Sequence, residues 1–142
     1  MFEKIVDILL VEDDIDDVKL ALQAFGVANL GNTVHVARDG VEALEFLFGA
    51  GPDADKKEPK TPGLILLDLK LPRLDGHELL KRIKGDPRTS GIPVIVLTSS
   101  GEERDVMRTY ELGVNSYIVK PVDFAQFTEA ARGIGKFWLV FD

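Results

Sequence analysis

Strand-length apolar runs alternate with segments of helical periodicity five times along the chain, and this alternation limits the fold more than any other feature. The apolar runs are Asp7–Val11, Thr33–Ala37, Leu64–Leu67, Val94–Leu97 and Ser116–Val119. The first, third and fourth are almost continuously apolar, which is typical of parallel strands buried on both faces. A repeated strand–helix unit requires right-handed crossovers. The sequence therefore predicts a doubly wound α/β domain, with five helices around a five-stranded parallel sheet.

The segments between the apolar runs carry apolar residues at helical spacing. We expect their buried faces to contain Ile15, Val18, Leu22 and Phe25; Val41, Leu44 and Leu47; Leu79, Leu80 and Ile83; Val106 and Tyr110; and Phe124, Phe127, Ala131, Ile134, Trp138 and Phe141. The fourth segment, 102–112, has the weakest pattern. N-cap carboxylates are expected at the helix starts, from Asp14, Asp39, Asp75 and Asp123.

Length and composition limit the classes of protein to which the chain can belong. A chain of 142 residues is long enough for one domain with its own core, so we expect a single domain over 1–142. The sequence has no Cys and only two His, which argues against disulfides and zinc sites. A net charge of −7 argues against binding nucleic acid through a basic face. With neither a membrane-length apolar run nor a signal-peptide pattern, we expect a cytoplasmic protein with protein partners.

Two segments stand outside the alternation. The segment 49–62 is polar and rich in Gly, Pro and Lys, so we expect an exposed loop, with an insertion that contacts a partner as the alternative. The segment 134–142 ends in five consecutive apolar residues, 137–141. We expect this tail to form a dimer contact, with folding back onto its own domain as the alternative.

Polar side chains gather at the expected carboxyl ends of the strands, where open parallel sheets bind ligands. They are Glu12, Asp13 and Asp14; Asp68; Thr98, Ser99 and Ser100; and Lys120 followed by Pro121. Carboxylates without His or Cys form an oxygen-only site that suits Mg²⁺ or Mn²⁺. A hydroxyl and an ammonium opposite them complete a cradle for a phosphoryl group. One strand-end Asp is explained equally well as a helix cap, but four such sets at one sheet edge indicate a binding site.

Four motifs, taken with their order and spacing, resemble the receiver domain of two-component response regulators. They are VEDD (Val11–Asp14), LLDLKLPRLDG (Leu66–Gly76), LTSS (Leu97–Ser100) and YIVKP (Tyr117–Pro121). The resemblance covers about residues 5–130. It implies a flavodoxin-like receiver fold with strand order 2-1-3-4-5. It also implies a signalling domain, not an enzyme, which assists its own phosphorylation and dephosphorylation.

The resemblance implies a role for each carboxylate of the motifs. Asp68 would be the phosphoacceptor, taking a phosphoryl group from a sensor histidine kinase or a phosphotransfer protein. Asp13 would bind Mg²⁺ directly and Glu12 through water, with Asp68 and the main-chain carbonyl of Lys70 as further ligands. Mn²⁺ would be able to substitute.

The same resemblance assigns the switching residues. Thr98 would supply the switch hydroxyl, Tyr117 the aromatic switch, and Lys120 the ammonium that pairs with the phosphoryl oxygens. The peptide before Pro121 is expected to be cis. Phosphorylation would then change the surface of the fourth helix, the fifth strand and the fifth helix, roughly 102–112, 116–119 and 123–136.

Two further implications concern partners. We expect no output domain after the fifth helix, so the switched surface would control a separate protein, and a homodimer would form through this surface and the 134–142 tail. The IDD after VEDD, the loop before the third strand and the FWL near the end resemble single-domain response regulators that serve bacterial phytochromes.

Two other functions compete with this interpretation. The first is a receiver fold that acts as a binding scaffold without phosphorylation, which the presence of Asp68, Thr98 and Lys120 disfavours. The second is a metal-dependent phosphohydrolase with an aspartyl nucleophile. Such enzymes usually carry a second Asp two positions after the nucleophile, where this chain has Lys70.

Overall fold

A computed structural model of the chain describes residues 7–28, 33–49, 59–71, 74–98, 103–120, 123, 125–127 and 129. The strands are β1 (Ile8–Val11), β2 (Val34–Ala37), β3 (Leu64–Asp68), β4 (Val94–Thr98) and β5 (Ser116–Val119). The helices with full bounds are α1 (Ile15–Ala28), α2 (Gly40–Phe48), α3 (Gly76–Gly85) and α4 (Glu103–Glu111). Residues 125–127 and 129 are also helical, where the fifth helix is expected. Outside the described residues lie Ser99, Ser100, Pro121, Phe124, Ala131, the 134–142 tail and most of the 49–62 segment.

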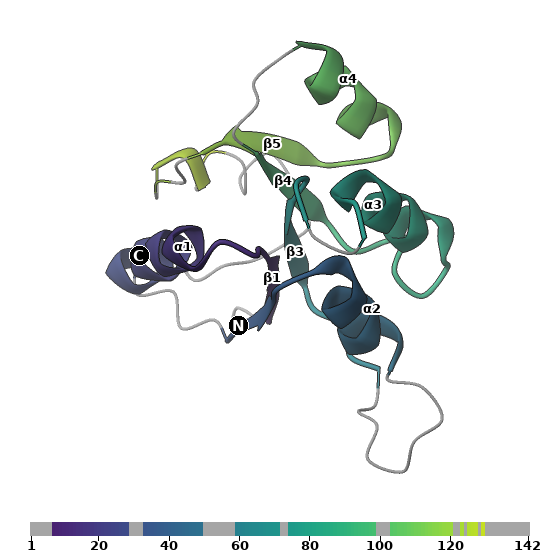
Figure 1. Cartoon of the computed structure of the whole chain (residues 1–142), viewed down its shortest axis with the longest axis horizontal. Helices are drawn as coiled ribbons and strands as arrows, with labels where there is room; N and C mark the ends of the chain where they lie inside the picture. The colour runs from purple at the N-terminus through teal and green to yellow at the C-terminus, as the bar shows by residue number, and fades with distance from the viewer. Residues whose placement is uncertain are drawn as a thin grey trace, which may run out of the picture.

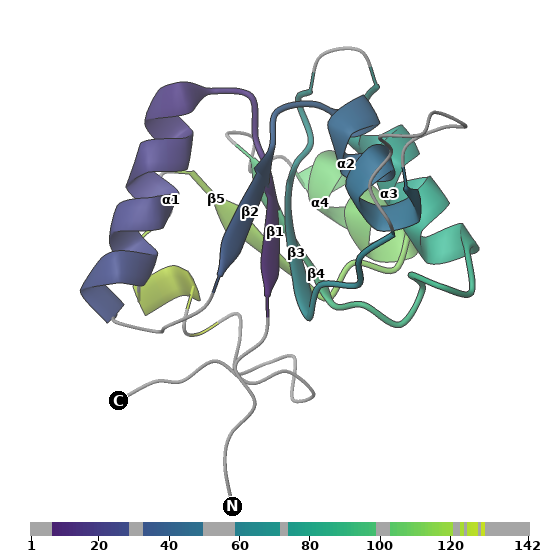
Figure 2. The same ribbon diagram turned by 90° about the horizontal axis from the view of Figure 1, so that it is seen from below.

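The strands form one parallel sheet in the order β2-β1-β3-β4-β5, which confirms the expected topology. Helices α2, α3 and α4 cover one face of the sheet, and α1 covers the other together with the helical residues near position 127 (Figures 1 and 2). The register aligns the carboxyl ends of the central strands: Val11 lies beside Leu67, and Asp68 beside Leu97. Side chains that follow these ends therefore share one edge of the sheet.

The core confirms that the central strands are buried on both faces. Every residue of β1, β3 and β4 is buried. Alternate strand residues, such as Leu9 and Ile65, pack with α2 and α3 in one cluster, while neighbours such as Leu10 and Leu66 are equally buried towards the other face. Among the described helices, none is long and apolar enough to cross a membrane.

The expected helix faces are confirmed for α3 and are partly wrong elsewhere. Leu79, Leu80 and Ile83 of α3 are all fully buried. In α1, Val18 is buried as expected and Ala21 is buried beside it, but Ile15 and Leu22 are 51% and 40% exposed. The side chain of Phe25 lies outside the described part of the helix. Val18 and Ala21 are three residues apart and share one face of the helix, so longer side chains beside this face reach solvent.

Helix α4 also differs from its expected pattern. The Tyr110 side chain is 48% exposed, and its neighbour Thr109 is buried. The side chain of Val106 lies outside the described part of this helix. The Met107 side chain is 54% exposed. In α2, Leu47 is buried together with the small residues Gly40 and Ala43. Small and polar residues thus take buried positions in these helices, which the spacing of large apolar side chains does not predict.

Three of the four expected caps are confirmed. Asp14 accepts hydrogen bonds from the amides of Asp16 and Asp17 (2.8 and 3.2 Å), and Asp39 accepts one from the Glu42 amide (2.9 Å). Asp123 accepts one from the Gln126 amide at 2.8 Å. Asp75 occupies the N-cap position of α3 but makes no side-chain cap bond. The expectation that its carboxylate caps the helix was therefore wrong.

Gly76 is the first residue of α3 and lies very close to the main chain that follows β3. Its amide donates to the Leu69 carbonyl at 3.1 Å. A Cβ at this position would lie 2.5 Å from the Leu69 Cα and 2.7 Å from the Asp68 carbonyl oxygen. These neighbours are main-chain atoms that cannot rotate away, so Gly76 is required here for space.

Replacing Gly76 with Ala is expected to lower the free energy of unfolding by about 2 kcal/mol, because the added methyl overpacks the turn behind Asp68. Urea denaturation measures the change. Gly85→Ala is the matched control at the other end of the same helix, because a methyl added there would meet no atom within 4 Å beyond its chain neighbours and its own helix backbone. Equal stability of the two variants would show that the turn relaxes freely.

Candidate functional site

The candidate site residues lie at the carboxyl ends of four strands, β1, β3, β4 and β5. Glu12 and Asp13 come directly after β1, and Asp68 is the last residue of β3. Thr98 ends β4, and its carbonyl accepts a hydrogen bond from the Lys120 amide at 2.8 Å. Parallel pairing therefore brings the carboxylates, the Thr98 hydroxyl group and the Lys120 side chain to one edge of the sheet.

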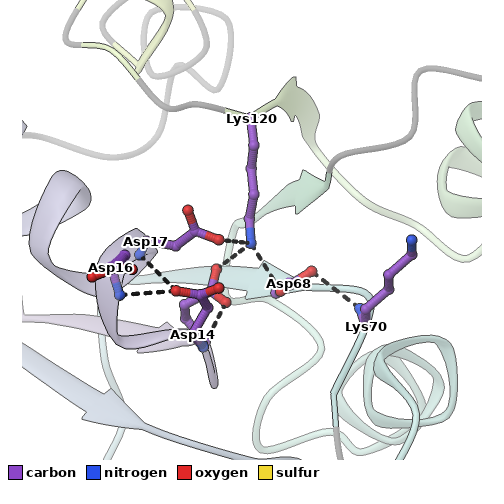
Figure 3. Close-up of polar contacts among 7 residues, drawn as sticks. Asp14, Asp16, Asp17, Asp68, Lys70 and Lys120 are labelled. Atoms are coloured by element: carbon purple, nitrogen blue, oxygen red, sulfur yellow. Dashed lines mark hydrogen bonds and ion pairs between the residues drawn. The ribbon is translucent and has the colours of Figure 1, made fainter.

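The Lys120 ammonium is the centre of this arrangement. Its Nζ lies 2.6 Å from Glu12 Oε1, 2.8 Å from Asp17 Oδ2 and 3.0 Å from Asp68 Oδ2. Figure 3 shows the side chain extending from the end of β5 to carboxylates on α1 and β3. An ammonium carries three N–H groups, so three carboxylates match its whole donor capacity.

The electrostatics of these ion pairs follow from burial and charge. Burial alone lowers the pKa of Lys120, but its carboxylate partners Asp17, Glu12 and Asp68 outweigh this and raise it above the usual value. Burial is the largest cause that raises the pKa of Glu12, and the result is about 7 against the opposing effect of Lys120. The nearby Asp68 carboxylate contributes to the same rise. Any additional cation in the site would favour the carboxylate form of Glu12.

The Asp68 carboxylate is held from two sides. Its Oδ1 accepts a hydrogen bond from the Lys70 amide at 3.0 Å, while Oδ2 faces Lys120. The side chain is only 6% exposed. Glu12 is fixed in a similar way, because its second oxygen, Oε2, accepts a bond from the Asp14 amide at 3.1 Å. Both carboxylates are thus oriented by the main chain that follows their strands.

The donor set fits a hard divalent cation. Glu12, Asp13 and Asp68 each offer a carboxylate oxygen, and these three atoms all lie within 4.8 Å of one another. Asp13 is exposed, so the group opens to solvent on one side. With Asp17 and Lys120 included, the ionised groups carry a formal charge of −3. Oxygen ligands and excess negative charge suit Mg²⁺ or Mn²⁺.

The other expected site residues are placed less directly. Thr98 is 1% exposed at the same sheet edge. Tyr117 lies beside Val96 in the β4–β5 register and packs, partly buried, against the core. The Lys70 amide binds Asp68, whereas its side chain is exposed and points away from the carboxylates in Figure 3. Pro121 lies outside the described residues.

Sequence reasoning misses one member of the site, Asp17. From the sequence, its position in the first turn of α1 is explained by the helix dipole alone. The structure places its carboxylate on Lys120, 103 residues away in the chain. The signal that could have found it is spacing, because Asp17 stands four residues after Asp13, one turn along the helix that begins beside the site.

Comparisons with known proteins agree with this geometry. The sequence matches the family described as response regulator receiver domain over residues 8–132. It is 40% identical over 132 residues to response regulator Rcp1 of Synechocystis sp., covering 93% of this chain and 88% of Rcp1.

Solved structures of similar proteins cover nearly the whole chain. The bacteriophytochrome response regulator RtBRR superposes with a TM-score of 0.85 at 47% identity, over 98% of this chain and 83% of RtBRR. The Mn²⁺-bound form of Rcp1 gives 0.75 at 37% identity, over 96% and 99%. The phosphorylated cyanobacterial phytochrome response regulator RcpA gives 0.75 at 40% identity, over 95% and 94%.

Proposed function

The chain belongs to the response regulator receiver domain family, and from that premise we propose that it accepts a phosphoryl group on Asp68 and thereby controls a partner protein. The observation that carries the proposal is the contact between Lys120 Nζ and Asp68 Oδ2 at 3.0 Å, beside the Glu12–Asp13–Asp68 oxygen group. A carboxylate nucleophile, an ammonium and a cation site are the parts that phosphoryl transfer needs. The phosphorylated structure of the relative RcpA supports the proposal.

The transfer step is a nucleophilic displacement at phosphorus. A carboxylate oxygen of Asp68 attacks the phosphorus of a phosphohistidine, forming an O–P bond. The N–P bond breaks, and its electron pair remains on the imidazole nitrogen of the donor. Water later attacks the acyl phosphate, which returns the Asp68 carboxylate and inorganic phosphate. The receiver resets by this second step.

This chain's own residues orient the nucleophile and stabilise the transferred charge. The Lys70 amide fixes one oxygen of Asp68 and so sets the plane of the carboxylate. The Lys120 ammonium lies where it can bind the oxygens of the incoming group. Thr98, at the end of the neighbouring strand, is the proposed hydroxyl donor to the same group. Tyr117 is proposed to change rotamer when Thr98 moves.

A divalent cation fits the carboxylates of Glu12, Asp13 and Asp68, and we include the Lys70 carbonyl as a proposed further ligand. When bound, Mg²⁺ or Mn²⁺ supplies positive charge that screens the phosphoryl oxygens from the acidic side chains. The Mn²⁺-bound structure of Rcp1 supports this assignment.

The direct test is to incubate the protein with Mg²⁺ and acetyl phosphate or phosphoramidate, and to search by mass spectrometry for a base-labile phosphoryl group on Asp68. One group per chain, lost slowly, supports the receiver function. If no donor yields an adduct, the chain is a binding scaffold. Rapid multiple turnover of phosphate esters would indicate the phosphohydrolase instead, although Lys70 leaves that reaction without an evident general acid.

We place the output on the surface of α4, β5 and the residues after Pro121. Val119 of β5 is 41% exposed, and Met107 and Tyr110 of α4 are 54% and 48% exposed. A cavity of about 410 Å³ lies along β5 and is bordered by Tyr117, among other residues. Apolar side chains beside a hollow on an edge strand offer a surface for a protein partner.

The proposed phosphoryl donor is a sensor histidine kinase or a phosphotransfer protein, because these are the partners of receiver domains. Similarity to RtBRR favours a phytochrome-type kinase, and we place the exchange in the cytoplasm.

A homodimer through the α4–β5 surface is proposed as one consequence, with the 134–142 tail as a further contact outside the described residues. In the presence of Mg²⁺ and the phosphoryl mimic beryllium trifluoride, the sedimentation coefficient is expected to reach that of a dimer at micromolar protein. Met107→Lys should return it to that of a monomer, because a charge would be buried in the contact. A monomer under all conditions would contradict the dimer but not the phosphorylation.

A further inference from the structure

We propose that Asp17 is a positioning residue that acts through Lys120 and limits the stability of the phosphorylated state. This inference rests on the proposed function of Asp68. Its starting observation is that Asp17 Oδ2 lies 2.8 Å from Lys120 Nζ, closer than Asp68 Oδ2 at 3.0 Å. Asp17 therefore competes for the ammonium that the phosphoryl group needs.

The contact is too well enclosed to be an ordinary surface ion pair. The Lys120 side chain is 14% exposed and that of Asp17 is 30% exposed. Solvent screens such a pair less than it screens two fully exposed groups. The Asp17 charge is therefore felt at Lys120 and at the oxygens that Lys120 binds.

The position of Asp17 is fixed by the start of α1. Its amide donates to Asp14 Oδ1 at 3.2 Å, so the cap that begins the helix also sets the direction of this residue. Figure 3 shows Asp17 on the α1 side of Lys120 and Asp68 on the β3 side. The ammonium is held between the two elements, and Asp17 retains it on the helix side.

Phosphorylation of Asp68 changes how strongly each of these two sides attracts the Lys120 ammonium. A phosphoryl group adds about 1.5 to 2 negative charges on the β3 side. Lys120 must then neutralise this group while it still neutralises Asp17 and Glu12. Asp17 also repels the added charge directly. Both effects make the phosphorylated state less stable than it would be with a neutral residue at position 17.

The neighbouring Asp16 provides a control for the charge of the acidic turn. Asp16 stands in the same first turn of α1 and carries the same charge. Its side chain is exposed, and its amide donates to Asp14 as the Asp17 amide does. Asp16 thus matches Asp17 in charge, helix position and capping environment, and a variant at this position separates the contact with Lys120 from the general effect of charge.

The test measures the half-saturating concentration of beryllium trifluoride in Mg²⁺ by fluorine NMR. Asp17→Asn is expected to lower it about three- to tenfold relative to the unmodified chain, because Lys120 is released to the phosphoryl mimic. Asp16→Asn should leave it unchanged, and Asp17→Glu should restore it towards the original value. Circular dichroism confirms folding, and Asp17→Ser serves as the second neutral variant.

Each outcome decides a separate claim. If Asp17→Asn and Asp17→Ser bind the mimic as Asp16→Asn does, or more weakly, Asp17 is only a structural residue and the inference is wrong. If Asp17→Glu binds as tightly as Asp17→Asn, the charge is not the cause. If the unmodified chain fails to bind the mimic in Mg²⁺, the proposed function of Asp68 fails and this inference fails with it.

Discussion

Replacing Asp68 with Asn is expected to abolish formation of the base-labile phosphoryl adduct with every donor. The amide is nearly isosteric with the carboxylate, so the buried position at the end of β3 stays filled, and the Lys70 amide keeps an oxygen acceptor. An amide oxygen is a much weaker nucleophile than a carboxylate and cannot form the acyl phosphate. Mass spectrometry after incubation with acetyl phosphate and Mg²⁺ measures the loss.

The matched control for this prediction is Asp75→Asn. Asp75 loses the same charge from the loop that follows Asp68, is exposed, and makes no side-chain cap bond at the start of α3. We expect this variant to be labelled like the original chain. A labelled Asp68→Asn protein would show that another carboxylate accepts the phosphoryl group, and Asp13 would be the next candidate.

Replacing Lys120 with Met is expected to give the second large effect, a loss of about 3 kcal/mol in the free energy of unfolding when Mg²⁺ is removed with a chelator. Glu12, Asp17 and Asp68 then lose the ammonium that joins them, and Glu12 and Asp68 are almost fully buried. Urea denaturation measures the change. Mg²⁺ should stabilise this variant more than the original chain, because the site carries one more unbalanced negative charge.

Lys19→Met tests whether the loss comes from the site or from net charge alone. Lys19 is an exposed residue of α1, and its replacement should change stability by no more than about 0.5 kcal/mol. If Lys120→Met is as stable as Lys19→Met in the absence of Mg²⁺, the three carboxylates accommodate one another without the ammonium. The central place given to Lys120 would then be wrong.

The fold could be predicted because each buried strand is a nearly continuous apolar run. Strands that alternate with helices form a parallel sheet, so the type of sheet followed as well. The meeting of Asp13, Asp68 and Lys120 followed from the same argument, since parallel strands end at a common edge. Neither conclusion depends on details of packing, which is why the sequence was sufficient for both.

Finer features depend on geometry that periodicity does not encode. Helix α1 buries Val18 and Ala21 while Ile15 is exposed, which reflects the face that the helix turns towards the sheet. Asp17 stands next to Val18 in the chain and reaches Lys120. The close approach of the Leu69 main chain, which leaves no room for a side chain at position 76, is likewise invisible in the sequence.

The contact between Lys120 and Asp68 also determines when the proposed site is complete during synthesis, because it joins residues from distant parts of the chain. Lys120 follows β5, which is both the last of the described strands and an edge of the sheet. A nascent chain that ends before Lys120 holds the acidic residues but lacks the ammonium that joins them. Under the proposed function, such a chain would be a poor phosphoryl acceptor, and the phosphoryl donor would meet a competent substrate only after Lys120 has been added.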